Sequence, residues 1–127
     1  MQPKKILIVD DSKAASMIQE YILGALRDCE VITAEDGIQG VEKAVAEQPD
    51  LILMDVVMPG MNGFEAVRLI RDHEATESIP IIMVTTRSES ANVNAGFASG
   101  CDDYIFKPID SAQLLEKIHK LADDRHR

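Results

Sequence analysis

L-I-L-M-D-V-V-M-P-G, residues 51–60, runs from four apolar residues into Asp55 and stops at a Pro-Gly break. An uninterrupted apolar run of this length is typical of a strand covered on both faces, as in a parallel sheet. A carboxylate at the end of such a strand is costly to remove from water unless another group pairs with it. The stretch therefore predicts a central strand over Leu51–Met54 and a partner for Asp55.

The rest of the chain alternates between strand-like and helix-like segments. Five short β-branched or apolar runs predict strands: Lys5–Val9, Glu30–Ala34, Leu51–Met54, Ile81–Val84 and Tyr104–Phe106. Apolar residues at helical spacing form five groups between and after them: Ala15, Ile18, Ile22, Leu23 and Leu26; Ile38, Val41, Ala44 and Val45; Phe64, Val67, Leu69 and Ile70; a weak segment over 92–98; and Leu114, Leu115, Ile118 and Leu121. Ser12, Asp36 and Asp110 stand where helix N-caps belong. This alternation predicts an α/β domain with a doubly wound (βα)5 parallel sheet and helices on both faces.

Composition and charge narrow the class of protein. The 127 residues, 46% of them hydrophobic, predict one soluble domain over 1–127, with a charged tail over about 122–127 that we expect to fray. The net charge of −9 argues against general nucleic-acid binding. No apolar run approaches the roughly 20 residues that span a bilayer, and the N-terminal apolar stretch is too short for a signal peptide. We therefore expect a cytoplasmic protein. Cys29 and Cys101 lack metal-like spacing and are expected to be reduced, buried thiols.

Chemically active side chains stand at successive strand ends. In an open α/β sheet, ligands bind beyond the carboxyl ends of the strands. The residues expected at that edge are Asp10, Asp11, Asp55, Thr85, Thr86 and Lys107. Clustered carboxylates repel one another unless a cation holds them, and their hard oxygen ligands suit Mg²⁺ or Mn²⁺. A lysine and a threonine hydroxyl complete a pocket for a tetrahedral anion, so the set predicts phosphoryl transfer to a carboxylate.

Each residue also has a structural interpretation. Asp10 and Asp11 could cap the first helix, and Asp55 could be a turn residue. Lys107 alone would most often be a solvated surface charge, and Thr85 an ordinary strand-end residue. Their coincidence at one sheet edge favours the chemical interpretation.

Four segments carry a resemblance to a known family: I-L-I-V-D-D-S (6–12), L-I-L-M-D-V-V-M-P-G-M-N-G (51–63), P-I-I-M-V-T-T (80–86) and G-C-D-D-Y-I-F-K-P (100–108). Together they closely resemble the receiver domains of two-component response regulators, over nearly the whole chain. The resemblance implies a flavodoxin-like sheet in the strand order 2-1-3-4-5.

The resemblance also implies a role for each site residue. Asp55 would accept a phosphoryl group from the phosphohistidine of a sensor histidine kinase or a phosphotransfer protein. Asp10, Asp11, Asp55 and the backbone carbonyl of Val57 would hold Mg²⁺. Lys107 would pair with the phosphoryl oxygens, and its peptide bond to Pro108 would be cis. Thr85 would move to the phosphoryl group while Tyr104 rotates inward, which reshapes the face made by the fourth helix, fifth strand and fifth helix.

Some positions depart from the family pattern or tune it. Thr86 stands where family members usually carry a smaller residue, and could narrow access. Val57 and Arg87 flank the route of the hydrolytic water; an apolar Val57 predicts a long-lived phosphorylated state. Asn62 stands where aspartate is common, at an expected turn.

The resemblance also implies partner surfaces. A kinase or phosphotransfer protein would dock on the first helix, whose exposed edge includes Ala14, Ala15 and Ile18. Output would pass to a target protein or a second copy through a face that includes Asn92, Asn94, Phe106 and residues 112–116. With no effector segment in the chain, we expect signalling by protein contact.

Three other functions share parts of this pattern. A phosphatase with an aspartate nucleophile needs a second acid two residues later, where Val57 stands. A flavodoxin-like flavin binder needs phosphate-binding donors in its first loop, where Asp10 and Asp11 would repel the phosphate. A receiver that only binds a partner would not need the full set of chemical residues present here.

Overall fold

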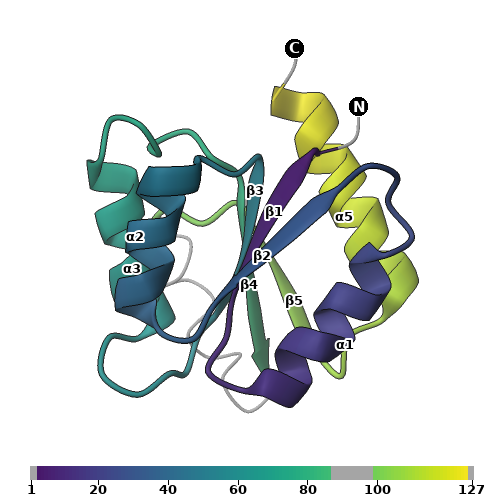
Figure 1. Cartoon of the computed structure of the whole chain (residues 1–127), viewed down its shortest axis with the longest axis horizontal. Helices are drawn as coiled ribbons and strands as arrows, with labels where there is room; N and C mark the ends of the chain where they lie inside the picture. Colours follow the sequence, from purple (N-terminus) through teal and green to yellow (C-terminus); the bar gives the residue numbers. More distant parts are fainter. Residues whose placement is uncertain (1–2, 87–98, 126–127) are drawn as a thin grey trace.

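Five parallel strands form one sheet in the order β2-β1-β3-β4-β5, as the resemblance implied (Figure 1). The computed structural model describes residues 3–86 and 99–125. The strands are β1 (Lys5–Val9), β2 (Glu30–Ala34), β3 (Leu51–Asp55), β4 (Ile81–Thr86) and β5 (Asp103–Lys107). Each strand lies parallel to its neighbours, so their carboxyl ends meet at one edge of the sheet.

Three strands are longer than the sequence predicted. β3 includes Asp55, β4 continues through Thr86, and β5 runs from Asp103 to Lys107. The pairing explains the extension, since Asp55 lies opposite Val84 and Thr86 lies opposite Lys107 in the register. Asp55, Thr86 and Lys107 are therefore the last residues of their strands, which hold them more rigidly than a loop would.

Two helices cover each face of the sheet. α1 (Lys13–Leu23) and α5 (Ser111–Arg125) lie on one face, and α2 (Gly37–Glu47) and α3 (Gly63–Asp72) lie on the other (Figure 1). The helix predicted over 92–98 lies outside the described residues. The α/β doubly wound architecture is confirmed for the part of the chain that the structure describes.

The core has two halves, one under each pair of helices. Alternate residues of β1 and β3 supply them: Leu7 and Ile52 face α2 and α3, whereas Ile8 and Leu53 face α1 and α5. Because successive side chains of a strand point to opposite faces, a strand covered on both sides is apolar throughout. All five residues of β3 are buried, which accounts for the uninterrupted run in the sequence.

The predicted N-caps are confirmed. Ser12 Oγ accepts a hydrogen bond from Ala15 N, Asp36 Oδ1 accepts one from Gln39 N, and Asp110 Oδ1 accepts one from Gln113 N. Asn62, expected only as a turn residue, proves to be the N-cap of α3. Its side chain accepts from Glu65 N, and Glu65 accepts in return from Asn62 N, which completes a capping box.

The apolar spacing of the helices overstates how much of each is buried. Ile38 and Leu69 share the apolar spacing of their helices but are 59% and 45% exposed, whereas Ile18, expected on the exposed edge of α1, is 57% exposed. Their helices bury narrower faces than the apolar spacing indicated, and α1 buries Ser16 and Gln19 beside its aliphatic residues. Within the region where a frayed tail is expected, α5 continues to Arg125 and Ala122 is buried.

Candidate functional site

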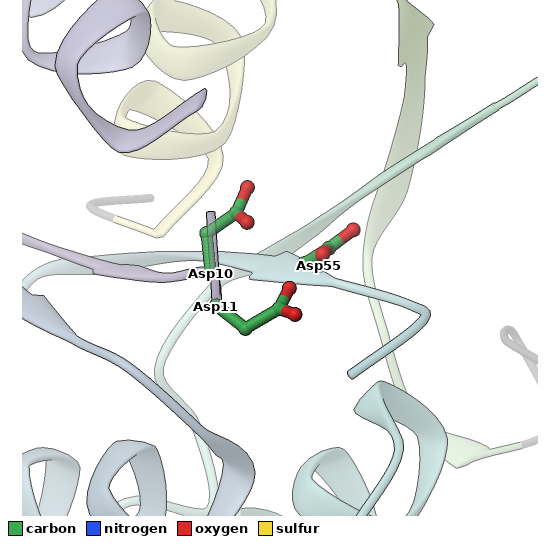
Figure 2. Close-up of side chains that lie close together, drawn as sticks. All are labelled: Asp10, Asp11 and Asp55. Atoms are coloured by element: carbon green, nitrogen blue, oxygen red, sulfur yellow. The ribbon is translucent and has the colours of Figure 1, made fainter. Parts of the chain in front are cut away.

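Three carboxylates gather at the carboxyl edge of the sheet. Asp10 and Asp11 follow β1, and Asp55 is the last residue of β3. Oxygen atoms of the three side chains lie within 4.8 Å of one another, and the carboxylates point to the same side (Figure 2). Asp10 and Asp55 are buried, at 3% and 7% exposure, while Asp11 is exposed. The sequence placed these three residues together correctly.

Lys107 supplies a cation between the two buried carboxylates. Its Nζ lies 3.5 Å from Asp55 Oδ1 and 3.6 Å from Asp10 Oδ2. The pairing of β5 with β4 brings it there, and the Lys107–Pro108 peptide bond is cis, as the resemblance implied. One lysine against three carboxylates leaves an excess of negative charge, which favours the binding of a further cation.

The surroundings of Asp55 change its acidity. Burial, and secondarily the charge of Asp10, raises the pKa of Asp55 from 3.8 to about 7, and Lys107 opposes the shift. Near neutral pH the Asp55 carboxyl is therefore divided between its protonated and ionised forms. A bound divalent cation would favour the ionised form, which is the nucleophilic one.

The backbone around Asp55 is held closely. Val56 N donates to Val84 O at 3.3 Å, and Gly63 N donates to Val56 O at 2.8 Å. A Cβ atom added at Gly63 would lie 2.2 Å from the Asp55 carbonyl oxygen. Only glycine therefore lets the start of α3 approach the end of β3 this closely.

Asp10 is fixed by donors at both oxygens. Ser12 N donates to Asp10 Oδ1 at 2.9 Å, and Gln19 Nε2 donates to Asp10 Oδ2 at 3.2 Å. Gln19 was missed at the sequence level although it is 1% exposed. The signal was present in the helical spacing, since positions 19, 22, 23 and 26 share one face of a helix.

The remaining predicted residues lie in differing surroundings. Thr85, near the end of β4, is 1% exposed, and Thr86 is partly buried. Tyr104 is 7% exposed and belongs to the core half under α2 and α3. The Val57 side chain is 58% exposed. Arg87 lies outside the described residues.

Comparison with known proteins identifies the family. The sequence profile of the response regulator receiver domain matches residues 6–119. The chain belongs to the response regulator receiver domain family. Receiver domains act in two-component signalling, so the coarse role of this chain is regulatory. This membership favours a signalling role over the flavin binder and the phosphatase, which Val57 and the Asp10–Asp11 pair already disfavoured.

Relatives and solved structures agree with the assignment. The chain is 40% identical over 120 residues to protein PilH of Pseudomonas aeruginosa, covering 91% of this chain and 94% of PilH. It is 38% identical to the response regulator PleD of Caulobacter vibrioides, of which it spans 26%. A receiver domain of a Pseudomonas aeruginosa sensor histidine kinase superposes with a TM-score of 0.86 at 30% identity, covering 94% of this chain and 98% of that one. That structure has a magnesium ion coordinated in its active site cleft.

Among the described residues, no helix combines the length and apolar character needed to cross a membrane.

Proposed function

We propose that this chain is a phosphorylation-activated switch in which Asp55 accepts a phosphoryl group from the phosphohistidine of a sensor histidine kinase or a phosphotransfer protein. The observation that carries the proposal is the position of Asp55, buried at a strand end between two carboxylates and Lys107. In the transfer, an Asp55 oxygen forms a bond to phosphorus while the bond from phosphorus to the imidazole nitrogen breaks. The nitrogen keeps the electron pair of that bond.

The donor set fits a divalent metal. Hard carboxylate oxygens with one lysine as counter-charge suit Mg²⁺ or Mn²⁺ better than softer metals. Asp10, Asp11, Asp55 and the carbonyl of Val57 would hold the ion, and a relative with magnesium in the corresponding cleft supports this. When bound, the ion would neutralise charge on the transferred phosphoryl group.

Other residues of the chain would bind the phosphoryl group and transmit its presence to the output face. Lys107, already 3.5 Å from Asp55, would pair with the phosphoryl oxygens. Thr85 would donate its hydroxyl to the phosphoryl group, and Tyr104 would move with it to change the output face. In the same way the chain would catalyse its own phosphorylation and dephosphorylation, with Thr86, Val57 and Arg87 setting access and lifetime.

Two surfaces would contact partners. On α1, Met17, Ile18 and Tyr21 are 64%, 57% and 87% exposed, an apolar strip that fits a kinase or phosphotransfer helix. Beside it, Ala14 is exposed and Ala15 is half-buried. Output to a protein target or a second copy would use β5 and α5, including Phe106 and residues 112–116. Asn92 and Asn94, expected on the same face, lie outside the described residues.

The remaining parts of the proposal are broader. We propose that residues 1–127 act as one receiver domain in the cytoplasm, without contact to nucleic acid or membrane. The net charge of −9 supports the first of these two exclusions.

Phosphate uptake tests the assignment of Asp55. The chain, incubated with Mg²⁺ and acetyl phosphate, should gain one phosphoryl group by intact mass, and chelation of the metal should prevent it. Asp55→Asn should abolish uptake because the amide is not a nucleophile. The control Asp72→Asn, an exposed aspartate at the end of α3, should behave like the parent chain. Uptake that persists in Asp55→Asn would refute the proposal.

A further inference from the structure

Gln19 is a buried polar side chain whose hydrogen bonds meet the acidic cluster. It is 1% exposed, and its Nε2 donates to Asp10 Oδ2 at 3.2 Å and to the Ala15 carbonyl oxygen at 3.2 Å. Its Oε1 is buried without a hydrogen-bond partner among the described residues. Gln19 therefore gives both amide hydrogens to acceptors and receives nothing in return.

The orientation of the amide follows from these contacts. With the amide turned over, Oε1 would face a carboxylate oxygen and a carbonyl oxygen, both of which are acceptors. Nε2 would then be buried without a partner. Only the observed orientation makes the two hydrogen bonds, so Asp10 determines which way Gln19 points.

Packing alone does not explain an amide at this position. An unpartnered buried oxygen costs stability, and positions 22 and 23 on the same face are Ile22 and Leu23. A leucine at position 19 would continue this aliphatic face and would leave no orphaned oxygen. What the amide adds at this position is the hydrogen bond to Asp10, so its role points to the carboxylate that it contacts.

Gln19 and Lys107 both approach the same oxygen atom, Asp10 Oδ2. The Gln19 amide is 3.2 Å from it, and Lys107 Nζ is 3.6 Å from it and 3.5 Å from Asp55. Gln19 fills one of the acceptor positions of Oδ2 and so competes with Lys107 for this oxygen, while Lys107 also pairs with Asp55. Loss of the Gln19 donor would let Lys107 pair with Asp10, where a cation would have to compete with it.

We propose that Gln19 is a positioning residue that holds the Asp10 carboxylate for Mg²⁺ and keeps Lys107 shared between Asp10 and Asp55. The inference rests on the proposed function, because it assigns Gln19 a role toward the metal of that site. Partners that orient metal ligands typically change metal affinity by about 10–100-fold when they are removed.

The test compares Gln19→Leu with the parent chain in the absence of any phosphodonor. The dissociation constant for Mg²⁺ alone, from calorimetric titration, should rise about tenfold. The unfolding temperature without metal should change by only a few degrees, because losing the donor to Asp10 and losing the orphaned oxygen act in opposite directions. In acetyl phosphate assays, half-maximal rate should need more Mg²⁺, while the rate at saturating Mg²⁺ should change little.

A double variant separates positioning from packing. In the Asp10→Asn background, Gln19→Leu should cause no further loss of Mg²⁺ affinity, because Gln19 acts through the Asp10 carboxylate. An equal loss in both backgrounds would overturn the inference, as would unchanged Mg²⁺ affinity in the single variant. Gln19→Met serves as a second variant. If both Gln19→Leu and Gln19→Met lose the fold, the amide is structural and the inference is wrong. If the parent chain itself binds no Mg²⁺, the proposed function fails instead.

Discussion

At the scale of single residues, the site shows how position assigns different properties to identical side chains. Asp11 is exposed, whereas Asp10 and Asp55 are buried. Asp10 receives donors from Ser12 and Gln19, while Asp55 carries a pKa raised by burial to about 7. Asp55 combines a raised pKa with a place on the central strand, which suits a nucleophile that a bound cation would ionise.

Val57 offers a test of how long the phosphorylated state lasts. Its apolar side chain is 58% exposed two residues after Asp55 and gives no hydrogen bond to an attacking water. We expect Val57→Asn to speed the loss of aspartyl-phosphate about fivefold, the effect of one added hydrogen bond of about 1 kcal/mol in the transition state. The measurement is the decay of the phosphorylated form by intact mass after the phosphodonor is removed.

Val57→Ala is the matched control for this prediction. It shortens the side chain without adding a hydrogen-bonding group, so its decay rate should remain close to that of the parent chain. Equal acceleration in both variants would mean that the size of the Val57 side chain, and not its lack of polar groups, limits attack by the water. No acceleration in Val57→Asn would contradict the prediction itself.

The residues found by sequence and those missed differ in a physical way. Asp10, Asp55 and Lys107 follow apolar runs, so their convergence follows from strand direction alone. Gln19 contributes no charge and sits among apolar neighbours, and its role depends on a contact with Asp10 that only the folded chain makes. Gly63 is a similar case. The requirement for glycine at this position is visible only once the fold brings it against the Asp55 carbonyl oxygen.

At the scale of elements, Arg71 ties α3 to the segments that precede β4 and β5. Its guanidinium donates to the carbonyls of Ile79 at 2.7 Å and Gly100 at 2.8 Å, and to Asp102 Oδ2 at 2.8 Å. Asp102 Oδ2 also accepts from Ile81 N at 2.8 Å. The cluster fixes the turn that leads into β5, and β5 delivers Lys107 to the site.

We expect Arg71→Met to lower the free energy of unfolding by about 2–3 kcal/mol, because buried carbonyl oxygens lose a charged donor. The matched control is Arg68→Met, at an exposed position of the same helix, which should change stability by less than about 0.5 kcal/mol. Urea unfolding followed by circular dichroism measures both. Equal stability of the two variants would show that the Arg71 cluster does not hold these elements together.

Element boundaries and faces were predicted less well than element order. The alternation of periods is a local signal, so it located every described strand. The ends of the strands depend on pairing with neighbouring strands, which the sequence does not display. As a result, β3, β4 and β5 are longer than predicted. On α2, contact with the sheet is made through small residues, since a Cβ at Gly40 would lie 2.9 Å from Val9 Cγ1. A hydropathy pattern gives little weight to glycine, so the apolar spacing grouped Ile38 with the residues of α2 that pack on the sheet.

At the scale of the whole molecule, the strand order converts distant sequence positions into one site. With β1 and β3 adjacent at the centre, residues 10, 11 and 55 meet at a single edge, and β5 brings residue 107 across β4. The same arrangement concentrates negative charge in a protein whose net charge is already −9. The fold therefore bears an electrostatic cost at this edge that a divalent cation would relieve.

This cost predicts how stability depends on pH and Mg²⁺. The pKa of Asp55 rises from 3.8 in the unfolded chain to about 7 in the fold. Between these values the folded chain binds more protons than the unfolded chain, so raising the pH destabilises the fold through this group. Without metal, the unfolding temperature of the parent chain should fall from pH 5 to pH 8 more steeply than that of Asp55→Asn. The two proteins differ only at position 55, so the difference between their profiles reports this side chain.

Mg²⁺ should reverse the effect where Asp55 is ionised. At pH 8, Mg²⁺ at about 100 times its dissociation constant adds about 2.7 kcal/mol, which would raise the unfolding temperature by about 10 °C. At pH 5 the Asp55 carboxyl is protonated, and the proton competes with the metal for it. The same Mg²⁺ concentration should therefore raise the unfolding temperature much less. Differential scanning calorimetry of the parent chain and Asp55→Asn, with and without Mg²⁺, measures all four slopes. Parallel pH profiles for the two proteins would show that Asp55 ionises in the fold as it does in the unfolded chain, and the electrostatic cost of this sheet edge would then lie elsewhere.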